Sequence, residues 1–254
     1  MNAQIFCGVQ YFFQKPKTLW NLLRWGCINQ TAILVCEQEK LVYVLNPKVA
    51  TSTIVEFFSG VAHGSTPDLT QAQKMASRNV RYIEHSDELQ KFQAKGFRVF
   101  SYVRHPYDRL ISLFHSKYVW RDEKGLYQKE KFANACGLKM VKGFEDMVQK
   151  IVKTPDALSD THFISQTALL FGQNPNTEYD YIGDLTDFEK TFPDMLKSFG
   201  VDKPMPVARN QTIKARQQNW ADYFSPELEE QAFKRYRSDF ERFGFERMLR
   251  PEST

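Results

Sequence analysis

Two short segments of this sequence place a cation and hydroxyl side chains directly after an apolar run. In the first, the run 41–45 leads through Asn46 and Pro47 to Lys48, which is followed by Val49, Ala50, Thr51, Ser52 and Thr53. The first N–H groups of a helix have no intrahelical partner and carry the positive end of its dipole, so they attract anions. The pattern therefore indicates an anion site, although a helix cap beside a surface lysine fits it equally well.

The second segment has the same order of parts. Arg104 follows the apolar run 98–103, and Ser112 comes two turns into the next helical pattern. A guanidinium group binds phosphate oxygens with two parallel hydrogen bonds, so Arg104 and Ser112 would suit a phosphate group. The alternative is that Arg104 pairs with Asp108 and that Ser112 is a small residue at a packing contact.

The elements that must position these residues alternate between strand and helix. Apolar and β-branched runs predict strands, and one-sided apolar spacing with caps predicts helices. The predicted strands are 41–45, 98–103 and 179–183, and the predicted helices are 52–61, 87–95, 107–118, 143–152, 188–199 and 225–244. This alternation predicts an α/β fold with a parallel central sheet flanked by helices, in which ligands bind at the carboxyl ends of the strands.

The length of 254 residues suits one domain. We find no repeat and no linker, so we expect a single domain over residues 1–254. Its motif-bearing core extends over about residues 41–245, whereas residues 1–40 carry little readable signal. The polar stretch 119–160 is expected to shape the pocket for an acceptor.

Composition excludes several classes of protein. A net charge of +4 with basic and acidic residues interspersed argues against a nucleic-acid partner. The four cysteines form no CxxC pair and have no histidine at metal-ligand spacing, which favours free thiols in a reducing compartment and no metal site. We find no signal peptide and no run long enough for a membrane span, and therefore expect a cytoplasmic protein.

The two segments together resemble motifs of the PAPS-dependent sulfotransferases, in which PAPS is 3′-phosphoadenosine 5′-phosphosulfate. They are most similar to the carbohydrate branch that includes the chondroitin, HNK-1 and heparan 2-O-sulfotransferases. The matching segments are Pro47-Lys-Val-Ala-Thr-Ser-Thr53, Val103-Arg-His-Pro-Tyr-Asp-Arg-Leu-Ile-Ser112, Asp160-Thr-His-Phe163, Tyr179-Asp-Tyr-Ile-Gly183 and Asn210-Gln-Thr212. In the third of these, Phe163 stands where the family usually has tryptophan.

This resemblance implies a P-loop-like sulfotransferase fold, PAPS as the sulfuryl donor, PAP as the product and no metal ion. It implies that Lys48 and the residues Val49 to Thr53 hold the 5′-phosphosulfate. Arg104 and Ser112 would hold the 3′-phosphate. A loop that includes Asn210 and Lys214 would cover the nucleotide.

The acceptor hydroxyl needs a general base, and histidine is the usual choice near neutral pH. His162 lies in the Asp-x-His segment of the chondroitin-type enzymes, where Asp160 would orient it. His85 lies between the two nucleotide motifs, where the heparan-type enzymes place a catalytic histidine. Both histidines remain candidates at this stage.

The sequence leaves the acceptor open. A hydroxyl or amine of an oligosaccharide or of another small molecule, such as a secondary metabolite, would fit, and the oligomeric state is unknown. Two other classes share the strand–loop–helix pattern: a P-loop-like nucleotide kinase, and a non-catalytic module that binds anions or glycans. A kinase would need a glycine-rich loop and a carboxylate for Mg²⁺, and neither is evident in the sequence.

Overall fold

A computed structural model describes Leu23 and residues 31–63, 80–82, 87–119, 138, 141–172, 174–203 and 219–248. The chain forms two compact units. The sheet unit consists of Gln30–Arg104 and Leu169–Arg216, and the helical unit consists of Met1–Asn29, His105–Ala168 and Gln217–Thr254. Each unit therefore gathers segments that are far apart in the sequence.

The sheet unit contains five strands in the order β3-β1-β2-β4-β5. Their bounds are Ala32–Cys36 (β1), Leu41–Val44 (β2), Val80–Tyr82 (β3), Arg98–Val103 (β4) and Tyr181–Asp184 (β5). The pairs β2–β4 and β4–β5 are parallel, whereas β1 is antiparallel to both β2 and β3. The α/β prediction is confirmed, but the sheet is mixed because β1 runs against its neighbours.

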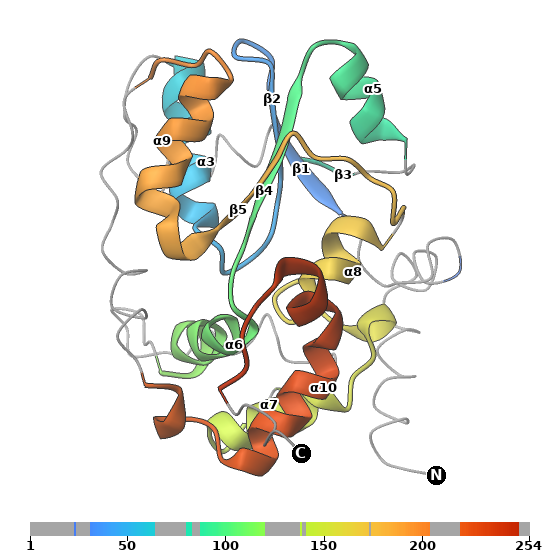
Figure 1. Cartoon of the computed structure of the whole chain (residues 1–254), viewed down its shortest axis with the longest axis vertical. Helices are drawn as coiled ribbons and strands as arrows, with labels where there is room; N and C mark the ends of the chain where they lie inside the picture. Colours follow the sequence, from blue (N-terminus) through green and yellow to red (C-terminus); the bar gives the residue numbers. More distant parts are fainter. Residues whose placement is uncertain are drawn as a thin grey trace. The chain divides into compact units, whose positions relative to one another are not determined.

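Helices cover both faces of this sheet. In Figure 1, α3 (Thr51–His63) and α9 (Phe188–Ser198) lie together on one side of the sheet, and α5 (Glu88–Ala94) lies on the other. The side facing α3 and α9 carries aromatic residues at alternate strand positions, among them Tyr43, Phe100 and Tyr102. Because both faces of β2 and β4 are covered, every residue of β2 and nearly every residue of β4 is buried.

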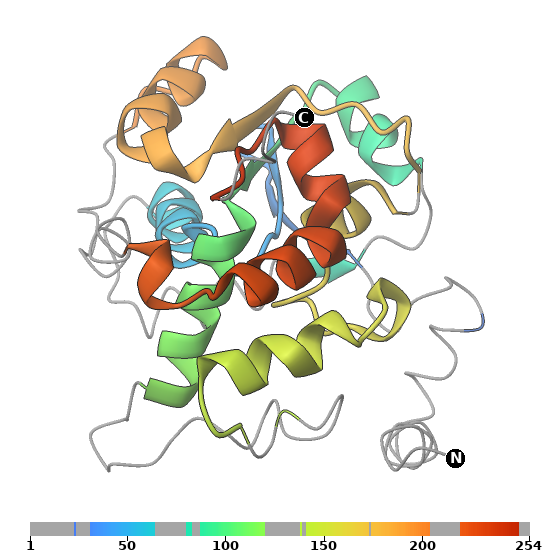
Figure 2. The ribbon, with the colours of Figure 1, turned by 60° about the horizontal axis from the view of Figure 1, so that its bottom comes forward.

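The helical unit packs three helices around a second core. They are α6 (Pro106–Phe114), α7 (Phe144–Val152) and α10 (Pro226–Phe243), and each of them contacts the other two. Figure 2 shows these helices close together. The shorter helix α8 (Gln166–Phe171) passes from the helical unit into the sheet unit. Among the described helices, none is both long and apolar enough to cross a membrane.

The boundaries of α10 follow local signals. Ser225 accepts a hydrogen bond from the Leu228 N–H at 3.2 Å, Pro226 is the first helical residue, and Gly244 ends the helix with φ 69°. The predicted helix over 107–118 is confirmed as helical throughout, but its last turn changes type. The α-helix α6 ends at Phe114, and His115–Val119 continue it as a π-helical turn.

Candidate functional site

The loop after β2 and the residue after β4 lie at one edge of the sheet, because these two strands are adjacent and parallel. Two side-chain contacts join them. The buried Asn46 donates from Nδ2 to the Tyr102 carbonyl at 2.9 Å, and Arg104 donates from Nη1 to the Lys48 carbonyl at 3.2 Å. The two cationic segments that the sequence singled out are therefore in direct contact.

The backbone of this loop is strained at two positions. Lys48 has φ 72° and Ala50 has φ 47°, and an L-residue adopts such left-handed values at a cost. Strain of this kind persists only where the surrounding structure holds it, and it concentrates at binding sites. Successive N–H groups in a tight turn that opens a helix can converge on an anion. The loop therefore has the backbone expected of a phosphate or sulfate site.

The hydroxyl of Thr51 closes this loop. It donates to the Asn46 carbonyl at 2.7 Å and lies 3.4 Å from the Tyr43 hydroxyl. Burial raises the pKa of Tyr43 to about 12, so the phenol stays protonated. Of the other loop residues, Val49 is fully buried, Ser52 is exposed and Thr53 is half-buried. Thr51 thus stabilises the loop, and Ser52 carries the most exposed of its hydroxyls.

The structure places the other predicted nucleotide ligands elsewhere. Ser112 is half-buried on α6 in the helical unit, so its pairing with Arg104 in the sheet unit stays a prediction. Asn210 and Lys214 lie outside the described residues, as does His85.

Asp160 and His162 form a hydrogen-bonded pair in the helical unit. Asp160 Oδ1 lies 2.7 Å from His162 Nδ1 and 2.9 Å from the His162 backbone N–H. Their side chains are 37% and 31% exposed. Burial alone would raise the pKa of Asp160, but the hydrogen bonds and charge of His162, with the charge of Lys117, hold that pKa below its usual value. When the ring is neutral, an ionised Asp160 at this distance favours the tautomer with the proton on Nδ1, which leaves Nε2 as the basic nitrogen.

Two other histidines in this unit have structural contacts. His105 caps α6 by accepting from the Tyr107 N–H at 3.3 Å, and its Nε2 lies 2.8 Å from the Glu246 carbonyl. Its ring stacks on Trp220 with centroids 4.3 Å apart. His115 Nε2 lies 2.7 Å from the Tyr223 hydroxyl, and burial lowers the pKa of His115.

Sequence reasoning missed the role of Arg109. Its side chain is 3% exposed and donates to the Ile164 carbonyl at 2.5 Å and to the Thr161 carbonyl at 2.9 Å. These carbonyls lie on either side of His162 in the sequence. Arg109 belongs to the Arg-Leu-x-Ser part of the second motif. Its partners are backbone carbonyls, however, and these cannot be recognised from residue types.

The described residues contain no group of three or more His, Cys, Asp or Glu side chains arranged to hold a metal ion. Cys36 is a buried free thiol whose pKa is raised by burial. The other three cysteines lie outside the described part of the chain.

Known proteins match this chain both at the level of a family and as individual relatives. A model of the sulfotransferase family matches residues 31–246. Carbohydrate sulfotransferase 12 of Mus musculus is 26% identical over 187 residues, which cover 65% of this chain and 44% of that protein. Its Xenopus laevis counterpart is 24% identical over 196 residues, with the same coverage. The chain thus spans less than half the length of these relatives. No solved structure matches it.

Proposed function

The chain belongs to the sulfotransferase family, and from this premise we propose that it transfers the sulfuryl group of PAPS to a hydroxyl group of a carbohydrate. In this reaction the acceptor oxygen forms a bond to sulfur, and the bond between sulfur and the 5′-phosphate oxygen breaks. PAP leaves, and the acceptor proton passes to a base. The names of the two relatives support a carbohydrate acceptor.

The observation that carries this proposal is the contact of Arg104 with the Lys48 carbonyl. It places a buried guanidinium beside a strained loop that opens a helix, and this combination suits a nucleotide with two separate phosphate groups. Lys48 would stabilise the negative charge that develops on the leaving phosphate oxygen, as cations do in phosphoryl transfer. Arg104 and Ser112 would bind the 3′-phosphate.

We assign the general base to His162. With the proton of the neutral ring on Nδ1, beside the ionised Asp160, Nε2 would take the acceptor proton, and the same carboxylate would stabilise the imidazolium that forms. His85 stays the alternative base, since it lies outside the described residues.

The donor is tested by thermal unfolding with nucleotides. PAP at about 100 times its Kd should stabilise the folded protein by about 2.7 kcal/mol, whereas ATP with Mg²⁺ should give a much smaller shift. Stabilisation by ATP with Mg²⁺ alone would favour a nucleotide kinase and overturn the PAPS assignment.

The reaction is tested by mass spectrometry of oligosaccharides incubated with PAPS and the protein. A sulfated product should form, and Lys48→Ala should slow its formation at least about 100-fold, as the loss of a transition-state contact does. Lys91→Ala is the matched control, because Lys91 is an exposed lysine of the same unit that pairs with Asp87 at the surface. If Lys48→Ala transferred sulfate as fast as Lys91→Ala, Lys48 would have no catalytic part.

A further inference from the structure

The turn that carries His162 is fixed by its own backbone. The N–H groups of Phe163 and Ile164 both donate to the Asp160 carbonyl, at 3.0 and 2.9 Å. With the two contacts of the Asp160 carboxylate to His162, the segment 160–164 forms one tight turn. The carbonyls of Thr161, Phe163 and Ile164 accept hydrogen bonds from side chains of other elements.

Arg109 of α6 supplies two of these donors. Its guanidinium spans the turn and reaches the carbonyls of Thr161 and Ile164, the residue before His162 and the second residue after it. Burial lowers the pKa of Arg109, yet an arginine keeps its charge inside proteins. Burying a charge is costly, and here two of the acceptors are neutral carbonyls instead of carboxylates. The charges of Asp239 and Asp156 favour the buried guanidinium, and its two hydrogen bonds hold the shape of the turn.

Tyr236 of α10 supplies a third donor. Its hydroxyl donates to the Phe163 carbonyl at 2.7 Å, and its side chain is 2% exposed. Burial raises the pKa of Tyr236 to about 12, so the hydroxyl remains a donor over the physiological range. At this residue α10 leaves helical geometry, with φ −109° and ψ 18°. The kink thus occurs at the residue whose side chain contacts the turn.

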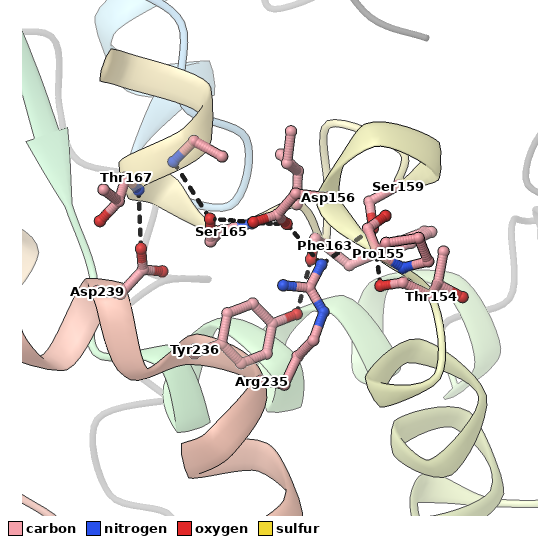
Figure 3. A network of polar contacts seen from close by, with 12 residues as sticks. Thr154, Pro155, Asp156, Ser159, Phe163, Ser165, Thr167, Arg235, Tyr236 and Asp239 are labelled. Atoms are coloured by element: carbon pink, nitrogen blue, oxygen red, sulfur yellow. Dashed lines mark hydrogen bonds and ion pairs between the residues drawn. The ribbon is translucent and has the colours of Figure 1, made fainter. Parts of the chain in front are cut away.

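The residues beside Tyr236 hold the segments before and after the turn (Figure 3). Arg235 donates to Asp156 at 2.5 Å and to the Ser159 hydroxyl at 3.0 Å, and Asp156 in turn accepts from the N–H and hydroxyl of Ser165.

On the far side of the turn, Asp239 accepts from the N–H groups of Gln166 and Thr167 at 2.9 and 2.7 Å. It thereby caps the first turn of α8 from a distant helix. Burial raises the pKa of Asp239, and these two N–H groups oppose the shift. One side of α10 therefore fixes the whole segment 156–167.

We propose that Arg109 and Tyr236 are positioning residues for His162. By holding the three carbonyls around it, they keep the His162 ring against Asp160 and set the direction of Nε2. This inference rests on the proposed function, because it matters for transfer only if His162 is the base. A shift of the base by about 1 Å is enough to slow a reaction up to about 100-fold. The loss of one hydrogen bond to the turn should therefore change kcat measurably.

The first test is Tyr236→Phe, which removes one hydroxyl and keeps the ring. We expect kcat to fall about tenfold while the KM for PAPS stays unchanged, because the Tyr236 hydroxyl donates to the Phe163 carbonyl and not to a residue that we assign to PAPS. Tyr179→Phe is the matched control, since the Tyr179 hydroxyl also donates to a backbone carbonyl at 2.7 Å but lies in the sheet unit. Both variants should lower the Tm by only a few degrees, so a fall in kcat specific to Tyr236→Phe would not be a stability effect.

The second test needs no activity. In protein with ¹⁵N-labelled histidine, NMR should show His162 as the Nδ1–H tautomer. In Tyr236→Phe or Arg109→Lys, its ring signals should move toward those of a free imidazole, which exchanges between its two tautomers. Arg109→Lys keeps the charge but loses the planar fork that reaches both carbonyls. Unchanged ring signals in both variants would contradict the positioning role.

The activity of His162→Ala distinguishes failure of the base assignment from failure of the positioning role. If His162→Ala keeps full kcat, the base assignment is wrong, and the positioning role fails with it. If His162→Ala is inactive while Tyr236→Phe and Arg109→Lys keep the kcat of the Tyr179→Phe control, the base assignment stands and only the positioning role is overturned.

Discussion

At the scale of single residues, Arg104 has two tasks in this molecule. It donates to the Lys48 carbonyl, which holds the strained loop, and we assign to it the 3′-phosphate of the nucleotide. The first task is structural and affects any ligand of the loop. The second would affect only nucleotides with a 3′-phosphate, so the two can be separated by the choice of nucleotide.

We expect Arg104→Ala to lower the affinity for PAP about 10- to 100-fold, as the loss of charge-assisted hydrogen bonds worth ~1.5–3 kcal/mol implies. The affinity for adenosine 5′-phosphate should fall much less. Titration calorimetry measures both. Arg98→Ala at the other end of β4 is the control, because Arg98 forms an exposed pair with Asp180. An equal loss for the two nucleotides would leave Arg104 with the structural task alone.

The ionised carboxylate of Asp156 stabilises the folded protein. Burial would raise its pKa, but the hydrogen bond and charge of Arg235, together with Ser165, hold that pKa below 3.8. A carboxyl group with a lowered pKa in the folded state stabilises the protein above the pKa of the unfolded chain. That stability is lost as the pH falls through the folded-state value.

Asp156→Asn should therefore reduce the free energy of unfolding by about 1–2 kcal/mol at pH 7, because it removes the charge from the hydrogen bonds to Arg235 and Ser165, with an allowance for the 31% exposure of the Asp156 side chain. The difference from the unmutated protein should narrow as the pH falls below 3.8. Urea unfolding across this pH range measures it. A difference that stays constant with pH would show that the charge of Asp156 does not contribute.

At the scale of elements, β5 approaches β4 closely at Gly183. A Cβ atom on Gly183 would lie 2.2 Å from the ring of Tyr102. That ring is fully buried and packs edge-on against Phe188 with centroids 4.9 Å apart, so it has little room to move. The absence of a side chain at Gly183 lets the aromatic core of the sheet unit close against β5.

Gly183→Ala should therefore destabilise the protein by about 1–3 kcal/mol, the usual cost of overpacking a core. Gly143→Ala is the control, because a Cβ there meets no atom within 4 Å. Its cost should be no more than the few tenths of a kcal/mol to ~1 kcal/mol typical of an N-cap position. Chemical denaturation measures the free energy of unfolding of both variants. An equal loss in the two variants would contradict a steric role for Tyr102.

At the scale of the whole molecule, the two units contain separate hydrophobic cores. The core of the sheet unit includes Phe188 and Phe192, which stack with centroids 4.9 Å apart, and the core of the helical unit includes Ile151. Substitutions that share no contacts have additive effects on stability, whereas substitutions of touching residues do not.

We expect the double variant Phe192→Leu/Ile151→Val to lose the sum of the two single effects within ~0.5 kcal/mol. Phe188→Leu/Phe192→Leu should deviate from its sum by more than this, since the two rings touch. In each cycle, the free energies of unfolding of the unmutated protein, the two single variants and the double variant provide the measurement. Additivity of the touching pair, or strong coupling of the pair from different cores, would contradict the division into two cores.

The sequence by itself determined the parts whose signals are local. The run 98–103 predicts β4 to the residue, and Ser225, Pro226 and Gly244 mark both ends of α10, because strand burial and helix caps depend on neighbouring residues. Lys48 and Arg104 follow two predicted strands, so parallel pairing was enough to bring them to one edge of the sheet. The family resemblance drawn from these motifs is confirmed by the match over 31–246.

Tertiary structure alone decided the rest. The antiparallel strand β1 lies in a stretch that carried little readable signal, and its direction depends on its partners β2 and β3. The change from α- to π-helix at His115 and the kink at Tyr236 were equally invisible in the sequence. Arg109 and Tyr236 act on backbone carbonyls, which every residue possesses, so no pattern of side chains could reveal them. The residues that we propose to bind the donor are thus readable from local sequence, whereas those that we propose to orient the base are defined only by the folded chain.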